Sequence, residues 1–157
     1  MIFGKTKTME KTNQLKIPIT DIELIKKLLP HREPMIMVNT LAYFTEKKAG
    51  STLLISEDNI FVSDGVFSEA GILEHMAQTA ALHIGYKQSL KNNIIKEGFI
   101  GAIKSSHISE LPKINETLST EMEVVYEIET MTMVKINTLV NGNCIATSEM
   151  TTVLKED

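Results

Sequence analysis

The sequence has almost no cysteine, since Cys144 is the one cysteine among its 157 residues. A lone cysteine cannot form a disulfide within the chain, which favours a reducing compartment, and we expect a cytoplasmic protein. Cys144 is a candidate catalytic thiol on chemical grounds. Its neighbours alternate between apolar and polar residues, however, which favours a packing or surface role within a strand.

Two further absences narrow the class of protein. No stretch approaches the ~18 consecutive apolar residues of a membrane span, and the N-terminus lacks the long apolar segment of a signal peptide. Basic residues are not in excess, because 16 Lys and Arg stand against 20 Asp and Glu, giving a net charge of -4. Nucleic-acid binding requires clustered cations to neutralise phosphates. We therefore expect neither a membrane protein nor a nucleic-acid-binding protein.

The composition that remains is that of an ordinary globular domain, with 43% hydrophobic and 23% charged residues. Residues 1–17 are polar and aperiodic, which predicts a flexible N-terminal arm. Residues 18–157 contain neither an internal repeat nor a low-complexity linker, so we expect one domain.

Two helices are predicted. The longer begins after Ser68, a good N-cap, and continues to about Lys91, with apolar residues at spacings of three and four. A second face carries mostly small residues, namely Glu74, Ala77, Gln78, Ala81 and Gly85. A helix with two such faces is usually enclosed by protein. A short helix capped by Thr20 or Asp21 precedes it and ends at Pro30.

Strand patterns cover most of the remaining chain. The predicted strands are residues 35–44, 51–55, 99–104, 118–128, 131–140 and 144–154, with a hairpin turn at Asn141-Gly142. This order excludes a doubly wound parallel sheet. It predicts the α+β hotdog fold, in which a curved antiparallel sheet wraps around one long central helix. An unprotected edge of that sheet favours pairing of two chains into a dimer.

Three stretches resemble the 3-hydroxyacyl-acyl-carrier-protein dehydratases, which are hotdog proteins. The first runs from Asp21 through Pro30-His31-Arg32 to Met35, and the second contains Glu74 followed by Ala77-Gln78. The third covers residues 98–103 and is most similar to the divergent dehydratase-like members of aryl-polyene pigment clusters. The resemblance implies a lyase that acts on acyl thioesters in fatty-acid, polyketide or polyene-type biosynthesis. No pair of histidines has convincing zinc-site spacing, so we expect no metal, and we expect no cofactor.

The chemistry of dehydration assigns candidate roles within this resemblance. Removing water from a 3-hydroxyacyl thioester requires a base for the α-proton and an acid for the hydroxyl. In the family, a loop histidine is the base, and the carboxyl of the central helix, here Glu74, is placed to be the acid in an apolar tunnel. Residues 56–68 contain no histidine, so we consider Asp64 and His107 as replacement bases. His31 is interpreted as structural. Expected substrate-binding residues are Phe67, Ala77, Gln78, Ala81 and Gly101.

The missing histidine leaves three functions open. The first is a dehydratase acting on acyl-carrier-protein or coenzyme A thioesters, with weak turnover when isolated. The second is a hotdog thioesterase in which Glu74 attacks the thioester or activates water. The third is a non-catalytic subunit that partners an active dehydratase paralogue. A homodimer or a heterodimer with such a paralogue is expected in each case.

Overall fold

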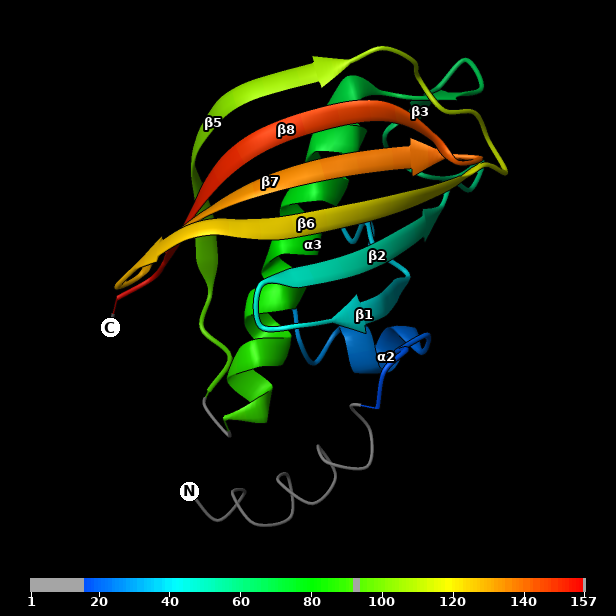
Figure 1. Ribbon diagram of the computed structural model, residues 1–157. Helices are drawn as coiled ribbons and strands as arrows, with labels where there is room; N and C mark the ends of the chain where they lie inside the picture. The colour runs from blue at the N-terminus through cyan, green and yellow to red at the C-terminus, as the bar shows by residue number, and fades with distance from the viewer. Residues whose placement is uncertain (1–15, 92–93, 157) are drawn as a thin grey trace.

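The computed structural model describes residues 16–91 and 94–156, in which an antiparallel sheet curves around one long helix (Figure 1). The six-stranded sheet has the order β1-β2-β6-β7-β8-β5. Its strands are β1 (Thr40–Phe44), β2 (Lys48–Leu54), β5 (Gly98–Ile108), β6 (Thr117–Ile128), β7 (Met131–Val140) and β8 (Asn143–Leu154). The predicted hotdog architecture is therefore confirmed. The predicted flexible arm lies outside the described residues, apart from its last two positions. None of the helices in the described ranges is long and apolar enough to cross a bilayer.

Helix α3 (Glu69–Leu90) is the central helix, and its bounds agree with the prediction. Its N-cap is Ser68, whose side chain accepts a hydrogen bond from the backbone N–H of Gly71 at 3.2 Å. Buried residues occur on several sides of the helix, since Ile72, Met76 and Leu82 are fully inaccessible. The small-residue face is needed because the chain elsewhere approaches this helix closely.

The short helix ends earlier than predicted. Helix α2 (Ile22–Ile25) is capped by Asp21, whose carboxylate accepts a hydrogen bond from the backbone N–H of Glu23. After Ile25 the backbone bonds span three residues, as in Leu28 N–H to Ile25 C=O at 2.9 Å. This tighter winding ends the α-helix before Pro30 is reached.

Strand β1 begins five residues later than predicted. Most of the segment before it is bonded to side chains of α3, whereas Asn39, directly before β1, donates its backbone N–H to the Thr52 carbonyl of β2 at 2.8 Å. The Met37 N–H donates to Gln78 Oε1 at 2.6 Å, and the Met35 carbonyl accepts from Gln78 Nε2 at 2.8 Å. At residues 35–37 these bonds take the place of sheet pairing, which keeps this part of the chain outside the sheet and fixed to the helix.

Strand β5 is longer than predicted and lies at the edge of the sheet. It pairs with β8 as far as Ile108, opposite Ala146. Nearly all of its residues are exposed on both faces, including the apolar side chains of Phe99, Ile100 and Ile103. A strand that is exposed on both faces does not require alternating apolar and polar residues. Ser105 to His107 show no such alternation, so the sequence did not predict them as part of the strand.

Two hairpin turns are closed by a pair of consecutive residues with positive φ. Asn141 and Gly142 have φ of 51° and 79°, so the predicted turn between β7 and β8 is confirmed. The loop before α3 contains a second turn of this kind at Asp64 and Gly65, with φ of 52° and 79°. It joins β3 (Val62–Ser63) to β4 (Val66–Phe67), a small hairpin that the sequence did not predict.

Candidate functional site

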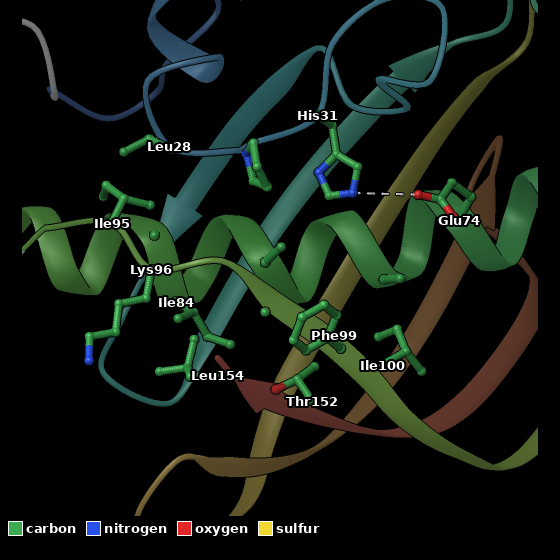
Figure 2. A pocket seen from close by; sticks show the side chains of 15 residues that line it. Leu28, His31, Glu74, Ile84, Ile95, Lys96, Phe99, Ile100, Thr152 and Leu154 are labelled. Atoms are coloured by element: carbon green, nitrogen blue, oxygen red, sulfur yellow. Dashed lines mark ion pairs between the residues drawn. The ribbon is translucent and has the colours of Figure 1, made fainter. Parts of the chain in front are cut away.

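A pocket with a volume of about 200 Å³ lies along one face of α3. Its walls are the segment that follows α2, the chain entering β5, and the end of β8 (Figure 2). Along the helix it extends from Glu74 to Gly85, a rise of about 16 Å at 1.5 Å per residue. Most lining side chains are apolar: Leu28, Ala77, Ala81, Ile84, Ile95, Phe99, Ile100 and Leu154.

Two polar side chains lie together at one end of this pocket, its polar end, whereas Thr152 and Lys96 line it farther along (Figure 2). Figure 2 shows Glu74 of α3 and His31 of the preceding segment pointing toward each other, with His31 Nε2 3.7 Å from Glu74 Oε1. Both side chains remain reachable from the solvent, since they are 29% and 30% exposed. A carboxyl and an imidazole this close can together accept one proton and donate another.

Gln78 holds Glu74 in place from one turn further along α3. Its Nε2 donates to Glu74 Oε1 at 2.8 Å and to the Met35 carbonyl at 2.8 Å. Its Oε1 accepts from the Met37 N–H. Because both donors and the acceptor are engaged while the residue is fully buried, Gln78 cannot rotate without losing these bonds. The glutamine of the Ala77-Gln78 pair therefore fixes the Glu74 carboxyl.

His31 is placed by its sequence neighbours and by the helix. Arg32 Nη1 donates to the carbonyls of Leu29 and His31, at 2.9 and 2.7 Å, which braces the turn after Pro30. The same segment approaches α3 so closely that a Cβ at Gly85 would collide with the Leu28 carbonyl. Glycine at this position brings the segment, and with it His31, to the pocket.

Sequence reasoning interpreted His31 as structural and so missed its place beside Glu74. The available signal was the combination of Arg32, which fixes the turn, with a small-residue face on α3 that admits a close segment. That signal does not reveal which segment approaches. The contact depends on packing between residues more than 40 positions apart, which no local pattern contains.

The other candidate residues are spread over the molecule. Ala77 and Ala81 line the pocket, and Gln78 contacts Glu74. Phe67 is fully buried in the core, where it packs edge-on against Phe61 at 6.3 Å. The remaining three do not line the pocket: Asp64 lies in an exposed hairpin turn, and Gly101 and His107 lie on the exposed strand β5.

His75 follows Glu74 but belongs to a different environment. Its Nδ1 donates to the Met37 carbonyl at 2.6 Å, and its Nε2 accepts from the Thr120 hydroxyl at 2.8 Å. Burial lowers the pKa of this imidazole from 6.5 to about 4. With both nitrogens engaged inside the protein, His75 is a structural residue that joins α3 to the sheet.

The described ranges contain no cluster of side chains suited to binding a metal ion. No group of three or more His, Cys, Asp or Glu side chains lies close enough there to hold an ion. The pair of His31 and Glu74 has no third ligand of this kind within those ranges, and protein zinc sites commonly use at least three.

Comparisons with known proteins agree with this fold. The chain is 23% identical over 145 residues to 3-hydroxyacyl-[acyl-carrier-protein] dehydratase FabZ of Latilactobacillus sakei, which covers 86% of this chain and 99% of that enzyme. Among solved structures, the dehydratase heterocomplex ApeI:P from Xenorhabdus doucetiae matches with a TM-score of 0.80 at 16% identity, over 85% of this chain and 91% of that one.

A more distant structure is a hypothetical thioesterase protein with coenzyme A from Streptococcus pneumoniae. Its TM-score is 0.60 at 13% identity, over 74% of this chain and 85% of that chain. This likeness shows a shared fold alone. The family model of the ApeP dehydratase, in contrast, matches residues 23–157, which is most of the sequence. The chain therefore belongs to the ApeP-like family of hotdog dehydratases.

Proposed function

We propose that this protein binds 3-hydroxyacyl thioesters and removes water from them to give 2-enoyl thioesters. The observation that carries the proposal is Glu74, a partly exposed carboxyl at the polar end of a mostly apolar pocket. Such a pocket suits a substrate with a hydrocarbon tail and one reacting polar end. The tail lies along Ala77, Ala81 and Ile84, and the 3-hydroxyl group lies at Glu74.

The thioester is delivered by acyl-carrier protein, with coenzyme A as the other carrier of the same chemistry. Support comes from the FabZ relative, whose name specifies an acyl-carrier-protein substrate. We propose polyene-type or fatty-acid biosynthesis as the pathway, and membership of the ApeP-like family supports this proposal.

A second hotdog chain is proposed to pair along β5. This edge strand exposes Phe99, Ile100 and Ile103, whose side chains are 53%, 38% and 45% accessible in the single chain. An unpaired edge with apolar side chains is unfavourable in water unless another chain covers it. Phe99 and Ile100 also line the pocket, so a partner on β5 would complete one of its walls. The ApeI:P heterocomplex supports a dehydratase paralogue as that partner, with a second copy of this chain as the alternative.

The assay for this proposal measures loss of water from a 3-hydroxyacyl-acyl-carrier protein by mass spectrometry. The protein is tested alone and after mixing with a dehydratase paralogue from the same organism. We expect a product lighter by one water, at a rate that increases in the mixture. Release of free carrier thiol without water loss would favour the thioesterase alternative. Binding of a non-hydrolysable acyl-pantetheine without any reaction, alone or in the mixture, would favour the non-catalytic subunit.

A further inference from the structure

The histidine that serves as base in the family is absent from the loop before α3, but the pocket contains another histidine, His31. We propose that His31 is the general base of this dehydratase and acts with Glu74, the acid, inside one chain. The inference rests on the proposed function and deepens it, because it names the group that takes the α-proton. The observation is the approach of His31 Nε2 to within 3.7 Å of Glu74 Oε1 at the polar end of the pocket.

The spacing of the pair suits the atoms to be removed. In a 3-hydroxyacyl thioester the α-proton and the 3-hydroxyl are on adjacent carbons, so acid and base must be close neighbours. At 3.7 Å, His31 and Glu74 lie slightly beyond direct hydrogen-bond distance, and both side chains face the cavity. Each is about 30% exposed, so each can contact the same bound substrate.

Of the four histidines, all of which lie in the described ranges, His31 alone lines this pocket. Both ring nitrogens of His75 are hydrogen-bonded in the core. His83 bonds to the Thr45 carbonyl at 3.0 Å and stacks on Phe44 at 5.0 Å. Within the described part of the chain, Nδ1 of His31 has no hydrogen-bond partner, so no neighbour there fixes its tautomer. Nε2, which lies 3.7 Å from Glu74 Oε1, is thus available for proton transfer.

Gln78 fixes the orientation of the Glu74 carboxyl, which is the acid of this proposal. Gln78 Nε2 donates to Glu74 Oε1, which makes this oxygen an acceptor and leaves Oε2 to carry the carboxyl proton. His31 then starts as the neutral base. The pair therefore holds one transferable proton before substrate binds, and Gln78 is a positioning residue for it.

The elimination balances with these two groups alone. His31 Nε2 takes the α-proton, and the electron pair of the broken C–H bond forms the double bond between the α- and β-carbons. The bond from the β-carbon to the hydroxyl oxygen breaks, and that oxygen takes the proton of the Glu74 carboxyl and leaves as water. The His31 imidazolium then returns its proton to the Glu74 carboxylate, which restores the starting state.

The test replaces His31 by asparagine in the full chain, assayed with the paralogue if the wild type requires it. Removing a positioned base is expected to lower kcat by about 10²–10⁴. KM and the affinity for a non-hydrolysable acyl-pantetheine should change little, because the apolar lining stays intact. The variant should also lose the limb of the pH–rate profile that reports the base. In His31→Gly, added imidazole should restore part of kcat, which a purely structural role would not allow.

A matched pair of carboxyl variants completes the experiment. Glu74→Gln should lose turnover, whereas Glu69→Gln, in the exposed first turn of the same helix, should keep it. If the wild type turns over substrate and His31→Asn does so at the same rate, the inference fails and the proposed function stands. Loss of turnover in His107→Ala together with its retention in His31→Asn would likewise overturn it. A wild type without turnover, alone and with the paralogue, would instead refute the proposed function.

Discussion

Glu74 and His75 are neighbours in the sequence, yet α3 presents them to two different environments. His75 is fully buried, and both of its ring nitrogens are hydrogen-bonded to the protein. Glu74 is 29% exposed at a pocket, and Gln78 holds only one of its oxygens. Polar groups whose hydrogen bonds are all made within the protein stabilise the fold. Groups with an unused atom facing a cavity are available for chemistry, and the two sides of α3 differ in this respect.

The core-facing side of α3 contains a continuous polar network. The Thr120 hydroxyl that donates to His75 also bonds Thr138 at 2.7 Å, which connects α3 to β6 and β7. One turn later, Thr79 donates to the His75 carbonyl at 2.9 Å and contacts Ser51 at 2.6 Å. Among the residues of α3 that line the pocket, Glu74 is polar, whereas the others are apolar, namely Ala77, Ala81, Ile84 and Gly85.

The largest expected contrast comes from replacing the two neighbours separately. His75→Ala leaves the Met37 carbonyl and the Thr120 hydroxyl without their buried partner and opens a cavity, so unfolding should become easier by about 3–5 kcal/mol. Glu74→Gln should leave stability within about 1 kcal/mol and lower turnover by about 10²–10⁴. Urea unfolding and the dehydration assay measure both. A larger loss of stability in Glu74→Gln than in His75→Ala would reverse the assignment of the two sides.

Lowering the pH should reduce the stability of the fold through the histidine on the core-facing side of α3. Burial lowers the pKa of His75 from 6.5 to about 4, so between these values the unfolded chain binds a proton that the folded chain does not. Stability is therefore highest above about pH 6.5 and falls as the pH decreases toward 4, by at most about 3 kcal/mol from this residue. His83, whose pKa burial also lowers, adds to the loss in the same direction.

Urea unfolding of the wild type and of His75→Gln across this range measures that contribution. The variant lacks the titrating group, so its stability should depend less steeply on pH than that of the wild type. Carboxylates affect both proteins equally and cancel in the comparison. Equal slopes in the two proteins would show that His75 does not carry the effect.

A methyl group at Gly85 should disturb the contact that brings His31 to the pocket. Alanine normally stabilises a helix relative to glycine by roughly 0.5–1 kcal/mol. Here its Cβ would collide with the Leu28 carbonyl, so Gly85→Ala should instead destabilise by about 1–3 kcal/mol. Turnover should fall as well, because His31 follows Leu28 by three residues. Stabilisation by Gly85→Ala, measured by urea unfolding, would contradict the close approach.

The smallest expected effects come from valine at two nearby positions of α3. Thr79→Val leaves the buried Ser51 hydroxyl without its acceptor and should cost about 1–2 kcal/mol of stability, with unchanged affinity for an acyl-pantetheine. Ala81→Val narrows the pocket and should weaken that affinity by about 1 kcal/mol, roughly fivefold, with little loss of stability. Titration calorimetry and unfolding together separate the two. The reverse pattern would place the substrate on the other side of the helix.

Local signals in the sequence predicted the fold well. Capping by Ser68, the periodicity of α3 and the Asn141-Gly142 turn depend on residues close in sequence, and the structure confirms them. The start of β1 was missed because Gln78 and His75 supply hydrogen bonds to the preceding segment from more than 35 residues away. The extent of β5 was missed because an edge strand exposed on both faces has no apolar alternation.

The candidate site was only partly predictable for the same reason. The position of Glu74 on the helix followed from periodicity and from the resemblance to the dehydratases. The position of His31 depends on Arg32 bracing a turn and on Gly85 admitting the Leu28 carbonyl, and neither contact is visible in a single local pattern. Long-range packing therefore determines which histidine meets the carboxyl.

A double-mutant cycle on His31 and Glu74 tests the central claim most directly. The kcat of wild type, His31→Asn, Glu74→Gln and the double variant is measured with the same 3-hydroxyacyl-acyl-carrier protein. Two groups that act as one acid–base unit are not additive, so the double variant should be about as slow as the slower single variant. Two separate losses that multiply in the double variant would show independent roles and contradict the pair.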